Sequence, residues 1–155
     1  MKKRIVAITM ISLLAVGCYS IKKYKAAAAI IEKLVVHPKH IKNVKVSLEK
    51  FSFTFDLQLL NQTHYDLGFT TGSLIEITEI KVFTLDAVLL ADIKTDISAI
   101  ELPANGSFLI ENIQVELATY RLIDKLDTII ELITTNNLQY QITIKAFGKE
   151  FKVWT

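Results

Sequence analysis

The chain has 155 residues, of which 51% are hydrophobic and 22% charged, with five glycines and two prolines. These values exclude a disordered or low-complexity protein and fit one compact domain with an appendage. The formal net charge of +2 comes from Lys2, Lys3 and Arg4, because the chain beyond residue 17 carries 15 basic against 16 acidic residues. A near-neutral body of this kind lacks the basic cluster that nucleic-acid binding needs. The single cysteine, Cys18, excludes an internal disulfide framework and cysteine-rich metal sites.

The N-terminus has the pattern of a bacterial export signal. A basic start precedes an uncharged apolar run from Ile5 to Val16, and a Gly-Cys pair follows it. The run ends in Leu-Ala-Val-Gly-Cys, which resembles a lipobox, in which the cysteine thiol is acylated and the preceding peptide is removed. Ala15 departs from that pattern, since leucine usually stands there. We therefore expect residues 1–17 to be a signal peptide and Cys18 to be lipidated.

An uncleaved membrane anchor is the alternative for this segment. The run Ile5–Ile21 has 17 residues, and a spanning helix needs about 17–25 apolar residues. Lysines flank the run on both sides, so the positive-inside rule does not set its orientation. Under both interpretations the rest of the chain is tethered to a membrane of the cell envelope, on the periplasmic side or at the cell surface.

Residues 18–43 are expected to form the tether. Four consecutive alanines, Ala26–Ala29, favour a juxtamembrane helix that ends before Pro38. Lysines near the start of this helix are candidates for contact with anionic headgroups, and simple solvation is the alternative. These lysines are Lys22, Lys23 and Lys25.

From Val44 onward the hydrophobic period is two, which predicts a β-rich domain over residues 44–155. Apolar and polar residues alternate along Phe51–Leu59, so this strand has one apolar face. A change of phase just before it predicts a turn or bulge near Glu49-Lys50. Turns are also expected at Thr71-Gly72-Ser73 and Pro103–Gly106. Short strands at this spacing favour an antiparallel sandwich or barrel. The further strands are Leu74–Leu85, Val88–Ile100, Phe108–Leu117, Leu138–Phe147 and Glu150–Trp154.

One segment, Tyr120–Thr134, has a helical period instead. Its apolar residues follow one another at spacings of one, three and four residues, and its charged residues lie on the opposite side. We expect an amphipathic helix that covers an open end or edge of the sandwich. The apolar positions are Leu122, Ile123, Leu126, Ile129, Ile130 and Ile133.

The order of these elements over Val44–Trp154 resembles the late embryogenesis abundant type 2 domain, also called the water-stress and hypersensitive-response domain. A strand ending at Asn61, a hairpin containing Gly72, the stretch Ala91–Ile97 and the turn region Ile100–Ser107 carry the resemblance. Family members commonly have Asn-Pro at the end of the first long strand, where this chain has Asn-Gln. The resemblance implies an immunoglobulin- or fibronectin-like β-sandwich with one amphipathic helix. It also implies membrane tethering and stress protection, and it brings no shared active site.

The histidines do not form a convincing metal site. His37 and His40 are three residues apart, but a zinc site needs three or four convergent ligands. We expect these two histidines to lie in a solvated linker and His64 to lie in a turn.

Paired carboxylates and aromatic residues also have structural explanations. The pairs Asp92/Asp96 and Asp124/Asp127 lie among lysines on polar faces, which favours exposed charges over acid–base catalysts. The phenylalanines of Phe51–Phe55 are expected to form a wall of the core, with a lipid-binding cleft as the alternative.

These observations predict a non-enzymatic protein that needs no cofactor or metal. We expect a membrane-tethered β-sandwich that acts as an interaction or stress-protection module at the cell envelope, with the membrane and a protein as its candidate partners. One alternative is a structural subunit of an envelope or virion assembly. Another is an apolar-ligand (lipid) binding protein, which the positive mean hydropathy favours.

Overall fold

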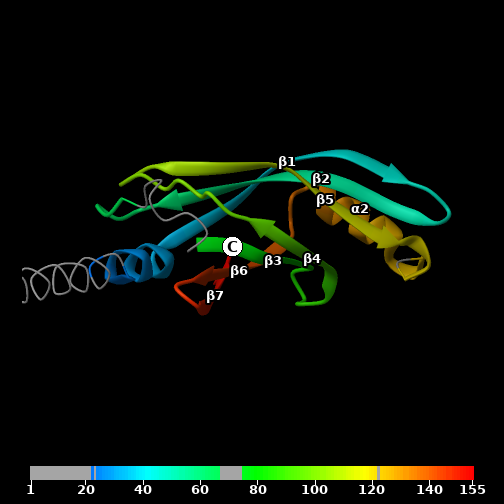
Figure 1. Cartoon of the computed structure of the whole chain (residues 1–155). Helices are drawn as coiled ribbons and strands as arrows, with labels where there is room; N and C mark the ends of the chain where they lie inside the picture. Colours follow the sequence, from blue (N-terminus) through cyan, green and yellow to red (C-terminus); the bar gives the residue numbers. More distant parts are fainter. Residues whose placement is uncertain (1–21, 23, 67–74, 122) are drawn as a thin grey trace, which may run out of the picture.

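Antiparallel strands form two sheets that pack face to face (Figure 1). The computed structural model describes residues 22, 24–66, 75–121 and 123–155. In this part of the chain one sheet has the order β1-β2-β5 and the other has the order β4-β3-β6-β7. An all-β, sandwich-like architecture is therefore confirmed. The strands are β1 (Leu34–Val46), β2 (Lys50–Asn61), β3 (Ile75–Phe83), β4 (Leu89–Ile97), β5 (Ser107–Ala118), β6 (Gln139–Ala146) and β7 (Lys149–Trp154).

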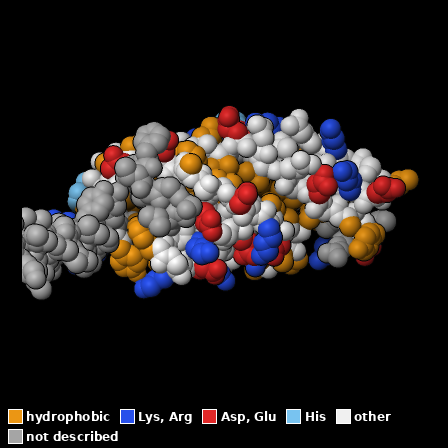
Figure 2. Space-filling model, in the orientation of Figure 1, with side chains coloured by type: hydrophobic (Ala, Val, Ile, Leu, Met, Phe, Trp, Pro, Cys, Tyr) orange, Lys and Arg blue, Asp and Glu red, His pale blue; other side chains and the backbone are white. Residues whose placement is uncertain are grey.

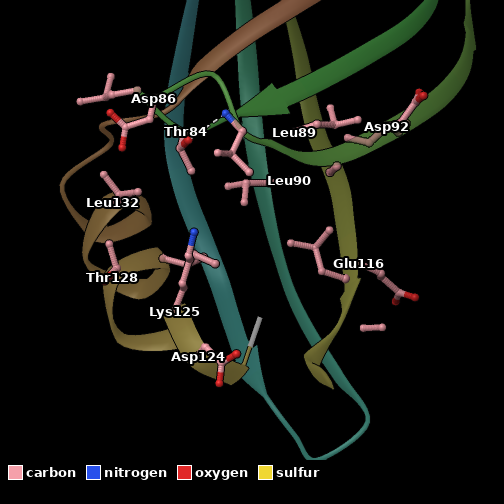
Figure 3. A pocket seen from close by; sticks show the side chains of 17 residues that line it. Thr84, Asp86, Leu89, Leu90, Asp92, Glu116, Asp124, Lys125, Thr128 and Leu132 are labelled. Atoms are coloured by element: carbon pink, nitrogen blue, oxygen red, sulfur yellow. Dashed lines mark hydrogen bonds between the residues drawn. The ribbon is translucent and has the colours of Figure 1, made fainter. Parts of the chain in front are cut away.

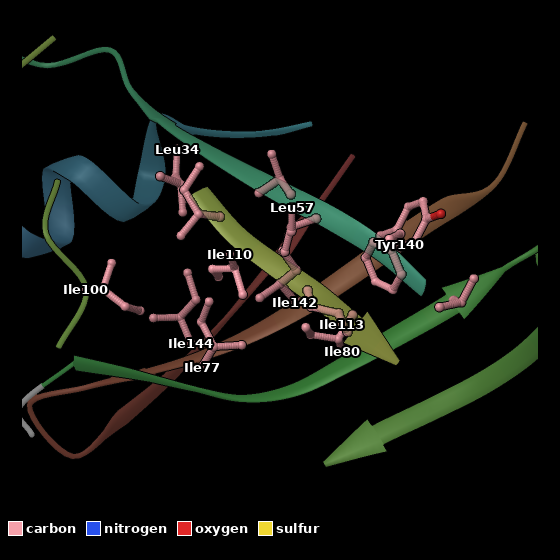
Figure 4. Packing of buried hydrophobic residues seen from close by; sticks show 14 of the residues in the cluster. Leu34, Leu57, Ile77, Ile80, Ile100, Ile110, Ile113, Tyr140, Ile142 and Ile144 are labelled. Carbon is pink, nitrogen blue, oxygen red and sulfur yellow. The ribbon is translucent and has the colours of Figure 1, made fainter. Parts of the chain in front are cut away.

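The core lies between the two sheets. Phe51, Phe53 and Phe55 of β2 are at most 1% exposed, and successive ring centroids lie 6.0 and 6.3 Å apart. Tyr140 of β6 faces them from the other sheet, with its ring centroid 4.9 Å from that of Phe55. Figure 4 shows apolar side chains of both sheets meeting in this layer, among them Leu57 of one sheet and Ile142 and Tyr140 of the other. The prediction that the phenylalanines form a wall of the core is confirmed.

The first strand starts earlier than the sequence pattern indicates. Residues 24–32 are helical, and β1 begins at Leu34, so the helix ends well before Pro38. Leu34 and Val36 are buried, because alternate residues of the strand face the core. Proline is tolerated in β1 because β1 is an edge strand. The expected start of the sheet at residue 44 is therefore corrected to Leu34, and much of the expected tether is packed on the sandwich.

The two ends of the sandwich carry different elements. At one end the helical residues 24–32 lie beside the β6–β7 hairpin, where the Tyr24 ring is 5.7 Å from Phe147 and the Lys149 ammonium donates to the Tyr24 hydroxyl at 2.9 Å. At the other end lie the β1–β2 turn, the β3–β4 hairpin and the helix α2 (Leu126–Thr134). Figure 1 shows this separation along the long axis of the molecule. We call the second end the α2 end.

The amphipathic helix is shorter than predicted. Two 3-10 turns, η2 (Thr119–Arg121) and η3 (Ile123–Lys125), replace its expected first turns. The N–H of Thr119 donates to the Glu49 carbonyl at 3.2 Å, which holds this segment on the β1–β2 turn and delays the helix. Ile129 and Ile133 of α2 are buried, as the spacing predicts. The expected turn near Glu49 is also confirmed.

The turn at Pro103–Gly106 is held by the end of β2. The N–H of Gly106 donates to the Pro103 carbonyl at 3.0 Å, and Asn105 has a positive φ of 52°. The buried amide of Asn61 donates to the carbonyls of Leu102 and Pro103 at 3.2 and 3.0 Å. The predicted turn is confirmed, and Asn61 is the side chain that joins it to the sheet.

Some predictions fall outside the described residues. These are the signal peptide at 1–17, the lipidation of Cys18 and the turn at 71–73. Among the described residues, none of the helices has the length and apolar character required to cross a membrane.

Candidate binding groove

A groove of about 910 Å³ opens at the α2 end of the sandwich. Three parts of the chain surround it: the β3–β4 hairpin with the first half of β4, the last residues of β5, and the face of η3 and α2 that looks toward the sheets. Figure 3 shows α2 on one side of the groove and Glu116 of β5 on the other, with Leu89 and Leu90 of β4 above. The groove is lined by Asp86, Leu89–Ile93, Glu116–Ala118, Asp124, Lys125, Thr128, Ile129 and Leu132, among others.

Exposed apolar side chains lie along one side of the groove. Leu85, Val88 and Leu89 are 56%, 48% and 49% exposed and follow one another along the β3–β4 hairpin. Single exposed apolar residues are ordinary, but adjacent ones beside a groove are typical of an interaction site.

The charged residues that line the groove are mostly acidic. Asp86, Asp92, Glu116 and Asp124 carry carboxylates, and Lys125 carries the one ammonium among the lining residues. Figure 3 shows these carboxylates around the periphery and Lys125 between α2 and β5. The groove therefore combines an apolar interior with a negative rim.

Two of these carboxylates are already paired. The Lys50 ammonium lies 3.0 Å from Glu116 and lowers the pKa of that carboxyl. Asp92 lies 3.6 Å from the ammonium of Lys94. Asp86 and Asp124 take part in none of the ion pairs between described side chains.

A network of charges covers the outer face of the four-stranded sheet next to the groove. Lys94 donates a hydrogen bond to Glu79, Lys81 lies 3.3 Å away, and Thr143 donates at 3.2 Å. These partners, Lys94 foremost, lower the pKa of Glu79 to about 2 against the opposing effect of burial. Figure 2 shows acidic and basic side chains gathered over β3 and β4. The mixed signs leave this face nearly neutral, unlike the rim of the groove.

Asp56 is buried on the outer side of the three-stranded sheet, although its position in the alternation predicts a polar, exposed face. It is 3% exposed, accepts a hydrogen bond from the Asn112 N–H at 2.9 Å and lies 3.0 Å from the Lys42 ammonium. Asn112 first, and Lys42 second, hold the pKa of Asp56 below its usual value. Both neighbours of β2 pair irregularly at this point: β1 between Lys39 and Lys42, and β5 opposite Phe55–Leu57.

The histidines lie apart from the groove. His37 and His40 are exposed in β1 and not in a linker, which corrects the prediction. The Nδ1 atom of His40 lies 3.4 Å from Asp56, a carboxylate distant in sequence. His64 follows β2, with its ring centroid 4.2 Å from that of Tyr65. No group of three or more metal-ligating side chains converges within the described part of the chain.

The acidic pairs noted in the sequence are divided by the fold. Asp92 and Asp124 line the groove, whereas Asp96 and Asp127 are exposed and lie outside its lining. The β3–β4 hairpin was not among the sites predicted from the sequence. The feature of the sequence that could have indicated this hairpin is the apolar segment Leu85–Leu90, in which Asp86 is the one charged residue.

One buried side-chain oxygen, the hydroxyl of Tyr140, lacks a hydrogen-bond partner within the described part of the chain. The side chain of Tyr140 is fully buried, and its hydroxyl makes no hydrogen bond with the described residues. Burial raises the pKa of this tyrosine. Figure 4 shows the hydroxyl pointing away from the end that carries residues 24–32.

Comparisons with known proteins add little to this geometry. No family model matches the chain, and no curated protein matches it. It is similar to a solved structure titled "Crystal structure of protein from Archaeoglobus fulgidus", with 10% identity and a TM-score of 0.42. The match covers 78% of this chain and 89% of that one. A similarity at this level decides neither the type of sandwich nor the function.

Proposed function

We propose that the protein is a non-enzymatic, membrane-tethered interaction module of the cell envelope, and that stress protection is the process it serves. The groove at the α2 end is the observation that supports the interaction part of this proposal. It has an apolar interior and exposed apolar residues at its mouth, as interaction sites do.

The position of the groove fits a tethered protein. The helical residues 24–32, which follow the proposed anchor, pack at the opposite end beside Phe147 and Lys149. A tether through Cys18 therefore enters the sandwich at the end away from the groove. The groove is then free to meet a partner on the side of the molecule that faces away from the membrane.

The finer type of fold belongs to the same proposal. We infer an immunoglobulin- or fibronectin-like sandwich related to the late embryogenesis abundant type 2 domain. One sheet of three strands opposed to one of four supports this inference.

Binding of an apolar ligand is the second candidate function. The volume of the groove and its lining of leucine, isoleucine and valine favour it. Native mass spectrometry of the membrane-extracted protein separates the two candidates. A co-purified lipid beyond a covalent anchor supports the second.

Tethering is tested by the intact mass of the protein extracted from membranes of its native host. Loss of residues 1–17 with added acyl groups on Cys18 supports a lipoprotein, and a full-length mass in the membrane fraction supports the uncleaved anchor. A protein that high salt releases from the membrane would overturn the tethering proposal.

The interaction is tested by a photo-crosslinking amino acid placed at Thr128, an exposed residue of α2 that lines the groove. The control position is Ser98, which is exposed just beyond the far end of β4. We expect one discrete adduct from position 128 in intact cells, absent at position 98 and lost when Ala118 is replaced by tryptophan to fill the groove. Equal labelling at both positions, or none, would argue against a binding groove.

A further inference from the structure

The residues that line the groove place it along the free edges of two strands. Five consecutive residues of β4, Leu89–Ile93, contact it, and so do three consecutive residues of β5, Glu116–Ala118. Neighbouring side chains of a strand point to opposite faces of the sheet. A groove that contacts every residue in turn therefore runs along the edge of the strand and not over one of its faces.

Both strands are outermost in their sheets. β4 is the end strand of β4-β3-β6-β7, and β5 is the end strand of β1-β2-β5. Each has one edge whose backbone N–H and C=O groups meet no neighbouring strand in the described residues. Such an edge is a template for an added strand, and proteins usually cover it or protect it with charges.

The helix α2 forms the far wall and does not fill the space. Asp124, Lys125, Thr128, Ile129 and Leu132 line the groove from one face of η3 and α2. They stand opposite β4 across a volume of about 910 Å³. An extended segment of five residues is about 16 Å long, and α2 itself, at about 1.5 Å per residue over its nine residues, is of similar length.

The charged residues at the rim of the groove favour a basic occupant over an acidic one. Asp86 and Asp124 carry no ion pair in the described part of the chain, and Lys125 is outnumbered by carboxylates. A negative rim repels anionic lipid headgroups and fatty-acid carboxylates, and it attracts lysine or arginine side chains. The apolar interior accepts the aliphatic side chains between them.

From these observations we propose that the groove binds an extended peptide segment of a partner protein, with basic and apolar residues in alternation, which adds as a strand to the free edge of β4. The apolar side chains enter the space between β4 and α2, and the basic ones lie on the rim near Asp86 and Asp124. This proposal rests on the proposed interaction function and names the chemistry of its partner.

The probe is a synthetic nine-residue peptide of alternating lysine and valine with blocked ends, titrated into the full-length protein in detergent by calorimetry. A peptide with glutamate in place of lysine is the charge control. Two further peptides carry N-methyl groups on alternate residues, one set on each edge of the extended chain. Oleate and vesicles of anionic lipid complete the series.

We expect the lysine peptide to bind and the glutamate peptide not to bind. One N-methylated set should abolish binding and the other should leave it intact, because an added strand uses the backbone groups of one edge only. Binding of both methylated sets with equal affinity would overturn strand addition.

Matched variants locate the site. The double variant Asp86→Asn with Asp124→Asn should bind the lysine peptide with about fivefold lower affinity, as expected for the loss of two exposed charge pairs. The variant Lys125→Met should bind the lysine peptide more tightly. Asp66→Asn with Glu101→Gln makes the same change of charge at the opposite end and should have no effect. Equal effects of the two double variants would show nonspecific attraction and overturn the assignment.

Failure of this inference differs from failure of the proposed function. If oleate or vesicles bind and the peptide does not, the groove takes an apolar ligand and the peptide proposal is wrong. If no probe binds but position 128 still gives a discrete adduct in cells, an interaction remains and its partner is not an extended basic peptide. If no probe binds and the adduct at position 128 is also absent, both the peptide proposal and the proposed interaction function are wrong.

Discussion

Replacing Tyr140 by phenylalanine removes one buried oxygen atom from the core and should stabilise the fold. The side chain is fully buried, and its hydroxyl has no hydrogen-bond partner among the described residues. A buried polar group without a partner costs about 1–3 kcal/mol. The void left by one oxygen atom costs only about 0.3 kcal/mol. The ring contact with Phe55, at 4.9 Å between centroids, is kept. We therefore expect the free energy of unfolding to rise by about 1 kcal/mol.

Urea unfolding followed by the fluorescence of Trp154 measures this change. Trp154 is the only tryptophan of the chain, and its ring centroid lies 5.2 Å from that of Phe83. For a slope of about 2 kcal/mol per molar urea, the midpoint should rise by about 0.5 M with the slope unchanged. Tyr24→Phe is the matched control, since that hydroxyl accepts from the exposed Lys149 side chain and its loss should be nearly neutral. A Tyr140→Phe variant less stable than the wild type by 1 kcal/mol or more would refute the reasoning and indicate a buried water on the hydroxyl.

Three further predictions concern the turn, the helix and the charge network. Asn61→Ala should lower the free energy of unfolding by about 2–3 kcal/mol, because it removes the amide donor to the Leu102 carbonyl and leaves the buried Thr63 N–H without its acceptor. Ile133→Ala should cost about 2–5 kcal/mol through the cavity it creates, and hydrogen exchange should show faster opening of α2. Glu79 has a pKa lowered from 4.5 to about 2, so its stabilisation is present above pH 4.5 and is lost as the pH falls toward 2. With solvent screening this amounts to about 1 kcal/mol, and Glu79→Gln should flatten the acid dependence of unfolding accordingly.

Neighbouring exposed residues provide the controls for these three variants. Gln62→Ala, Glu131→Ala and Glu150→Gln change exposed side chains and should stay within about 0.5 kcal/mol of the wild type. A loss of stability at Gln62 equal to that at Asn61 would contradict the role of the Asn61 amide. If Glu79→Gln leaves the pH dependence of unfolding unchanged, another carboxyl causes the acid transition. Asp56 is then the first candidate.

Local pattern was enough to find most strands. The alternation of Phe51–Leu59 placed β2 and its buried face, and the proline and Asn-Gly of Pro103–Gly106 placed the turn before β5. The spacing of Ile129 and Ile133 identified the buried face of α2. These predictions succeed because the signal is a period or a turn residue within a few positions of the chain.

Tertiary structure alone decided the rest. The start of β1 at Leu34 depends on its pairing with Asn61, which is distant in sequence. The helix propensity of the preceding alanines is a local property and does not show this pairing. Asp56 is buried because Lys42 and Asn112, distant in sequence, reach it across the sheet. The groove could not be predicted from the sequence for the same reason, since its rim joins side chains from the β3–β4 hairpin, β5 and η3. A period along the chain shows which face of a strand is apolar, but only the packing of separate segments decides which edges stay free and which charges meet.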